Sequence, residues 1–114
     1  MKPILPTLAL ILIPTLALAQ YTGPGSQPQV TTAAAAANAA DDTQVILEGQ
    51  LTSQINDDTY WFQDQSGKIR VEINRKRLPA EPINQHTRVR LRGEVDKHLT
   101  KATEVDVKQV EIIR

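Results

Sequence analysis

The chain of 114 residues contains no cysteine. Disulfide bonds, thiol chemistry and thiolate metal sites are therefore excluded, and stability must come from packing alone. Aromatic residues are scarce, with one Trp, one Phe and two Tyr. Lys and Arg together number 13, as do Asp and Glu, so the formal charge is balanced. Proteins that bind nucleic-acid phosphates usually carry a basic surplus, so we expect no nucleic-acid partner.

The sequence patterns of common catalytic and metal sites are also missing. There is no Gly-rich phosphate loop, no nucleophile elbow and no His-Glu-x-x-His motif. The only two histidines, His86 and His98, have no third ligand at a recognised spacing, so we interpret both as surface residues. The acidic pairs at 41–42 and 57–58 lack the spacing of a calcium loop and are typical of turns. We therefore expect no enzyme, no cofactor and no metal site.

The first 19 residues have the pattern of a secretory signal peptide. Lys2 precedes an uncharged apolar run from Ile4 to Leu18, and small residues stand at the cleavage positions before Gln20. A transmembrane anchor is the alternative, but the run is shorter than the ~20 apolar residues that a spanning helix needs. We predict cleavage after Ala19, or alternatively after Ala17, and no membrane span in the exported chain.

Composition divides the chain into a signal peptide at 1–19, a flexible segment at 20–31 and a folded domain at 32–114. The flexible segment is rich in Gly, Pro, Ser and Gln, which bury little apolar area. The domain begins with an alanine-rich run from Ala33 to Ala40, with Thr32 available as its N-cap. We predict a short helix there. It either packs on the domain or acts as a low-complexity tether.

Beyond residue 44, apolar and polar residues alternate with a period of two, which is typical of strands with one buried face. Five strands are predicted, and their inward residues are Val45, Leu47, Leu51 and Ile55; Tyr60 and Phe62; Ile69, Val71 and Ile73; Val89, Leu91 and Val95; and Val105, Val107, Val110 and Ile112. Gly49 and Gly93 mark bends, and a change of parity predicts a bulge near Lys108 and Gln109. Residues 75–85 contain two prolines and are predicted to form a connecting loop, with room for one helical turn.

These strands predict an all-β fold. Two of the five strands bend at a glycine, which favours a small closed barrel, because closure removes the exposed edges that a flat sheet would carry. An open sheet covered by the alanine-rich helix is the alternative.

Several segments together resemble one known family. They are DDT (41–43), VILEGQL (45–51), YWFQDQSGKIRVEI (60–73), RVRLRGEVDK (88–97) and EVDVKQVEII (104–113). In this order and spacing they resemble the bacterial OB-fold (BOF) family of exported stress-tolerance proteins, the YgiW/YdeI type. The resemblance implies a periplasmic five-stranded OB-fold barrel with a short leading helix. It also implies a role in tolerance of oxidative, metal, acid or antimicrobial-peptide stress, through binding and not catalysis.

One segment departs from that family. Similar members usually have a tryptophan in the loop after the third strand, whereas this chain has Arg75 to Pro79 there and its sole tryptophan is Trp61. The ligand specificity of relatives therefore cannot be transferred to this chain.

Three arginines alternate along the fourth strand. Arg88, Arg90 and Arg92 lie on one face, where guanidinium groups suit the carboxylates or phosphates of cell-wall or lipid head groups, or an acidic partner. The alternative is a solvated face paired with acidic neighbours such as Glu48 and Asp106, which is the default for half-buried strands.

Trp61 has the opposite parity to Tyr60 and Phe62, so we expect the indole to point outward. It is a candidate stacking residue, or alternatively it packs beneath the loop at 75–85. The candidate ligand-binding residues are Trp61, Arg70, Arg88, Arg90 and Arg92. We predict a non-enzymatic protein that binds a small anionic or cell-envelope ligand or a protein partner. Binding of single-stranded oligonucleotides is the alternative, although one outward aromatic is few for that function.

Overall fold

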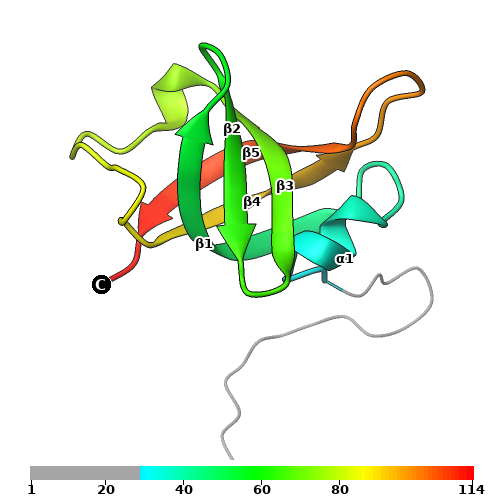
Figure 1. The fold of residues 1–114 in the computed structure, drawn as a ribbon, viewed down its shortest axis with the longest axis horizontal. Coiled ribbons are helices and arrows are strands. Elements are labelled where there is room, and N and C mark those ends of the chain that lie inside the picture. The colour runs from blue at the N-terminus through cyan, green and yellow to red at the C-terminus, as the bar shows by residue number, and fades with distance from the viewer. Residues whose placement is uncertain (1–28) are drawn as a thin grey trace, which may run out of the picture.

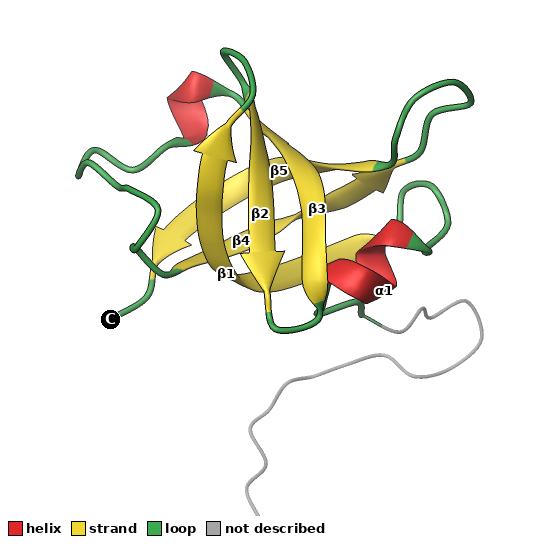
Figure 2. Ribbon diagram, viewed as in Figure 1, coloured by secondary structure: helices red, strands yellow, loops and turns green. Residues whose placement is uncertain are grey.

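The computed structural model describes residues 29–114, so the predicted signal peptide and most of the predicted flexible segment lie outside the described residues. The described part contains a short α-helix, a 3₁₀-helix and five strands (Figure 1, Figure 2). Their bounds are α1 (Ala33–Ala37), β1 (Gln44–Gln54), β2 (Thr59–Asp64), β3 (Gly67–Ile73), η1 (Arg75–Arg77), β4 (Val89–Asp96) and β5 (Glu104–Ile112).

The five strands form a closed barrel in the order β1-β2-β3-β5-β4, and β4 pairs back with β1 (Figure 1). Every pair is antiparallel except β3 with β5, which is parallel. The chain between these two strands therefore crosses over, and it contains η1, the following loop and β4. The predicted all-β barrel is confirmed, and the alternative of an open sheet is not.

The inside of the barrel is filled by the alternating apolar side chains. The largest fully buried ones are Phe62, Leu47, Ile73 and Leu91. The predicted inward position of Ile55 is wrong, because its side chain is 40% exposed. The pairing of β1 with β2 shifts register between Leu51 and Ser53. Such a shift reverses the parity of the residues that follow, so the end of the predicted strand faces solvent.

Two glycines allow strands of the barrel to approach closely. A Cβ atom on Gly49 would lie 2.3 Å from the backbone oxygen of Gln63 in β2. A Cβ atom on Gly93 would lie 2.1 Å from the backbone oxygen of Asp106 in β5. Beside Gly93 the register of β4 and β5 shifts and leaves Lys108 without a partner, which confirms the predicted bulge.

The alanine-rich segment is an ordered helix that packs on the barrel. The Thr32 hydroxyl accepts a hydrogen bond from a backbone N–H of the first turn at 3.2 Å, as the capping prediction requires. Ala33 and Ala36 are fully buried, and α1 lies against β3 and β2 (Figure 2). The helix ends at Ala37 and is shorter than predicted, because Asn38 leaves the helical conformation.

The loop after β3 begins with η1, which is the single helical turn allowed for by the sequence. The Asn74 side chain caps it by accepting a hydrogen bond from the Lys76 N–H at 3.0 Å. Leu78 and Ile83 from the rest of the loop pack against the core. Within residues 29–114, no helix has the length and apolar character needed to cross a membrane.

Candidate functional site

Outward-pointing side chains form rows that run across the strands. Trp61 of β2 lies opposite Arg70 of β3, and Arg70 lies opposite Glu104 of β5. Glu104 in turn lies opposite Asp96 at the end of β4. We call these four residues the Trp61 row. It brings together two sequence-predicted site residues, Trp61 and Arg70, with two carboxylates that were not predicted.

A second row beside it is entirely acidic. Glu72 of β3 lies opposite Asp106 of β5, and Asp106 lies opposite Glu94 of β4. Burial, and next the negative charges of Asp58 and Asp106, raise the pKa of Glu72 above its ordinary value of 4.5. We call Glu72, Asp106 and Glu94 the acidic row. Its negative charge attracts cations and repels polyanions at this end of the barrel.

Trp61 points outward, as its parity predicts, and is partly exposed. The ammonium nitrogen of Lys68 on β3 lies 5.2 Å from the centroid of the indole, which is cation–π distance. A ligand that contacts this ring would therefore also meet a positive charge. Elsewhere, the loop after β3 borders an open groove of about 360 Å³ that includes Leu51, Tyr60 and Ile83 but not Trp61.

A larger open groove, of about 1010 Å³, lies over β1 and the end of β2. Its lining is polar: amides from Gln50, Gln63, Gln65 and Gln85, hydroxyls from Thr31, Thr32, Thr52 and Ser66, and the charged residues Glu48, Asp64 and Arg88 around Gly49. We call it the polar groove. Gln50 pairs with Gln63, and Gln63 pairs with Lys68, so Lys68 lies next to the groove, although neither Lys68 nor Trp61 lines it.

Both carboxylates of the polar groove are engaged within the protein. Glu48 lies 2.8 Å from the Arg90 guanidinium. Asp64 accepts hydrogen bonds from the Ala33 N–H at 2.9 Å and from the Ser66 hydroxyl and N–H at 2.6 and 2.8 Å. Burial by itself would raise the pKa of Asp64, but these hydrogen bonds outweigh it and lower the pKa below 3.8.

The three arginines predicted as an anion-binding strip have different surroundings. Arg90 donates hydrogen bonds to Glu48 and to Glu111, at 2.8 and 3.1 Å, and these bonds raise its pKa. Arg90 therefore fits the alternative prediction, in which the arginines pair with acidic neighbours. Its partner on β5 is Glu111 and not Asp106, which the sequence had suggested. Among residues 29–114, Arg88 and Arg92 have no carboxylate within 4.0 Å, and of these two only Arg88 lines the polar groove.

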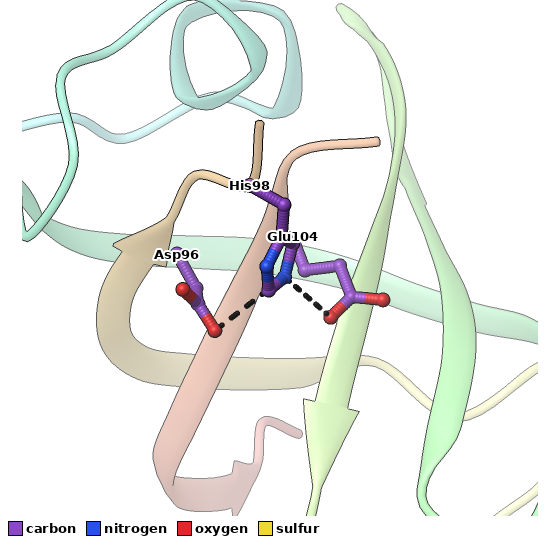
Figure 3. Close-up of side chains that lie close together, drawn as sticks. All are labelled: Asp96, His98 and Glu104. Atoms are coloured by element: carbon purple, nitrogen blue, oxygen red, sulfur yellow. Dashed lines mark ion pairs between the residues drawn. The ribbon is translucent and has the colours of Figure 1, made fainter. Parts of the chain in front are cut away.

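Figure 3 shows a cluster at the end of the Trp61 row, where the imidazole of His98 lies between two carboxylates. His98 Nε2 is 3.6 Å from the Asp96 carboxylate and 3.5 Å from the Glu104 carboxylate. The Glu104 side chain is only 10% exposed, and its other oxygen lies 3.4 Å from Arg70 Nε. The interpretation of both histidines as surface residues holds for His86 but only in part for His98, whose side chain is 25% exposed while its Nε2 atom is buried and has no hydrogen-bond partner within residues 29–114.

The fold and these surfaces can now be compared with known proteins. The model of one protein family, described as Bacterial OB fold (BOF) protein, matches residues 13–112. The chain belongs to the bacterial OB-fold family. It is 46% identical over 112 residues to the Calcium-regulated OB-fold protein CarO of Pseudomonas aeruginosa, covering 98% of this chain and 95% of CarO. It is 42% identical over 81 residues to Protein YgiW of Escherichia coli, covering 71% of this chain and 62% of YgiW.

The solved structure of Escherichia coli YgiW superimposes on this bacterial OB-fold protein with a TM-score of 0.70. The two sequences are 38% identical there, and the match covers 84% of this chain and all of that one. The Stn1-Ten1 complex of S. pombe contains a chain with a TM-score of 0.59 at 17% identity, covering 79% of each chain. At that identity the likeness concerns the fold alone.

OB-fold proteins commonly bind ligands on the outer face of β2 and β3 and with the loops that flank it. In this bacterial OB-fold protein that face carries Trp61, Lys68 and Arg70. The sequence pattern placed Trp61 and Arg70 there, because side-chain parity follows from a period of two. It missed the glutamine amides of the polar groove, which come from separate elements. It also missed Asp96 and Glu104, because the connection between β4 and β5 brings them to His98.

Proposed function

We propose that this protein is an exported, non-enzymatic binding protein of the bacterial periplasm. Its ligand is a small anionic molecule of the cell envelope, and the ligand chemistry that fits best is an acidic saccharide. The observation that carries the proposal is the polar groove, in which both carboxylates are engaged by other protein groups, while the Arg88 guanidinium forms no ion pair with any described residue.

The lining of the groove suits hydroxyl-rich ligands. The amides of Gln50, Gln63 and Gln85 each offer a donor and an acceptor, so they can bind sugar hydroxyls in either direction. The fork of Arg88 suits a carboxylate or a phosphate. Lys68, which is paired with Gln63 of the groove, and the adjacent Trp61 ring add a second cation and a flat apolar surface beside the groove.

Two further observations support the setting. The pattern of residues 1–19 is that of a secretory signal peptide, which predicts export. The name of the related protein CarO states that it is regulated by calcium, and the name of YgiW gives no function. Neither name is that of an enzyme. The family resemblance implies a role in stress tolerance. Such a role would follow if the fraction of the protein that is bound to ligand changes when the cell envelope is damaged.

An oligonucleotide fits this surface less well. Binding of single strands uses several stacking aromatics in a positively charged groove. Here Trp61 is the only tryptophan of the chain, and the acidic row lies next to the Trp61 row on the same face. The phosphates of a strand that stacked on Trp61 would therefore approach Glu72 and Asp106.

The proposal is tested by titrating the purified protein with an acidic disaccharide that contains a uronic acid, and with the neutral disaccharide of the same linkage. Trp61 fluorescence and calorimetry report binding. We expect the acidic disaccharide to bind more tightly and to lose affinity as salt is added. Arg88→Gln should weaken binding by about tenfold, the scale of one lost charged hydrogen bond. Arg92→Gln is the matched control, because Arg92 lies in β4 four residues after Arg88, has no ion pair within residues 29–114 and does not line the groove, and it should bind like the parent.

The outcomes separate the alternatives. Equal affinity for the acidic and neutral disaccharides, or equal loss in the Arg88 and Arg92 variants, would contradict the assignment of the groove. Tight, salt-dependent binding of a single-stranded oligonucleotide in place of both disaccharides would favour the alternative function.

A further inference from the structure

The cluster of Asp96, His98 and Glu104 lies outside the polar groove and has no part in the proposed function. Asp96 ends β4, Glu104 begins β5, and His98 lies in the connection between them. One ligand-type atom from each of the three side chains lies within 4.8 Å of the others. The connection thus places an imidazole nitrogen and two carboxylate oxygens around one point (Figure 3).

The spacing within the cluster differs from that of a hydrogen-bonded ion pair. A charged nitrogen that donates to a carboxylate lies about 2.7–2.9 Å from the oxygen. Here Nε2 of His98 lies 3.6 Å from Asp96 and 3.5 Å from Glu104. Two ligands that each lie about 2.1 Å from one tetrahedral zinc ion are about 3.4 Å apart. Both distances therefore match ligands that share an ion better than they match a hydrogen bond.

Burial supplies a second and independent observation. Nε2 of His98 is buried and has no hydrogen-bond partner among the described residues. An unsatisfied buried ring nitrogen is unfavourable, and a metal ion bound to its lone pair would satisfy it. The Glu104 side chain, which is 10% exposed, presents one oxygen to this nitrogen and the other to Arg70 Nε at 3.4 Å. Arg70 Nε is likewise buried without a hydrogen-bond partner among the described residues, so Arg70 holds this carboxylate through charge and not through a hydrogen bond.

The electrostatic surroundings also favour a cation. Two carboxylates of the cluster face Arg70, and the acidic row lies beside them, where Lys108 Nζ lies 3.0 Å from Asp106 and leaves Glu72 and Glu94 in excess. The charges of Asp106, Glu104 and Asp96 all contribute to the raised pKa of Glu72, after burial and Asp58. This end of the barrel therefore has a negative potential into which a divalent cation would be drawn.

We propose that Asp96, His98 and Glu104 bind one divalent transition-metal ion of the zinc class. One imidazole nitrogen with two carboxylate oxygens suits such ions, whereas calcium prefers six to eight oxygen ligands. Three protein ligands leave a fourth position of a tetrahedral ion open to water or to an outside ligand. The site lies at the far end of the Trp61 row from the indole, so the bound ion would add positive charge to the OB-fold binding face.

The test is calorimetric titration of the untagged full-length protein, first freed of metal with a chelator, with ZnCl₂ and with CaCl₂. We expect one Zn²⁺ per chain and much weaker binding of Ca²⁺. His98→Ala should weaken Zn²⁺ binding by at least about tenfold, since even outer partners of a metal contribute that much. His86→Ala is the matched control, because His86 is the other histidine, is exposed and lies outside the cluster, and it should bind like the parent.

A second measurement does not depend on the stability of any variant. Titration of the parent protein with Co²⁺ should produce the intense visible absorption of a tetrahedral ion, and Zn²⁺ should displace it. Absence of Zn²⁺ binding, equal loss in the His86 and His98 variants, or a Co²⁺ spectrum of the weak octahedral type would overturn the assignment. Because Arg88 does not touch this cluster, Arg88→Gln should leave Zn²⁺ binding unchanged, so failure of the metal site and failure of the polar groove are distinguishable.

Discussion

Replacing Gly93 by alanine should strongly destabilise the barrel. The new Cβ would lie 2.1 Å from the backbone oxygen of Asp106, and 2.9 Å from both the carbonyl carbon of Asp106 and the Cα atom of Val107. All three are backbone atoms, so no side-chain rotation relieves the overlap. Reaching even 3.0 Å, below which real Cβ contacts essentially never occur, requires the two strands to separate beside the bulge.

The cost follows from that separation. Overpacking of a well-packed interior costs about 1–3 kcal/mol, and a clash with backbone belongs at the upper end of this range. For a domain of this size about 3 kcal/mol corresponds to a fall in Tm of roughly 12–24 °C. Thermal and urea unfolding, followed by circular dichroism and by Trp61 fluorescence, measure the change. Gln109→Ala is the control, because Gln109 lies on the same bulge but is exposed, and it should change stability by less than about 0.5 kcal/mol.

A fall in Tm of only one or two degrees in Gly93→Ala would refute this reasoning. It would mean that β4 and β5 separate at this point without loss of packing, and that the close approach of their backbones does not hold the barrel together.

Three further predictions concern charged side chains. Asp64→Ala should lower the free energy of unfolding by about 1–2 kcal/mol at neutral pH, because the Ala33 N–H loses its acceptor. The native pKa of Asp64 is lowered below 3.8, so the difference between variant and parent should disappear as the pH falls through that pKa, as measured by urea titrations. Glu72→Gln should stabilise the protein at neutral pH by about 0.2–1 kcal/mol, because Glu72 lies opposite the negative charge of Asp106 across β3 and β5. The native pKa of Glu72 is raised, so the gain in stability should be present above that pKa and absent below pH 4.5. A gain that stays unchanged at low pH would contradict this explanation. Arg90→Gln should cause a small loss of stability in low salt that vanishes in about 1 M salt, where charges of exposed side chains are screened; a loss that persists in high salt would show that Arg90 acts through packing.

Side-chain parity was the most reliable information in the sequence. The alternation of apolar and polar residues identified the buried residues of β3 and β4 and placed Trp61 outside, because a strand has a strict period of two. The same rule failed at Ile55, where a register shift between β1 and β2 reverses the parity. Such a shift depends on the partner strand, so the sequence of one strand does not reveal it.

Local chemistry also determined the start of α1, because the capping hydroxyl of Thr32 acts within one helical turn. Where the helix packs depends on Asp64, at the end of β2, and on Ser66, in the turn that follows, which accept hydrogen bonds from its first N–H groups. Residues about 30 positions apart meet there, and no local pattern encodes their meeting.

The candidate sites show the same division. The sequence by itself determined which residue types were available: one tryptophan, two histidines, three alternating arginines and no cysteine. Only the closed barrel decided which charges remain free, because it places Glu48 and Glu111 on either side of Arg90 and leaves Arg88 in the polar groove. It likewise brings Glu104 to His98, since strand pairing across β4 and β5 acts over distances in sequence that neither motif spacing nor composition records.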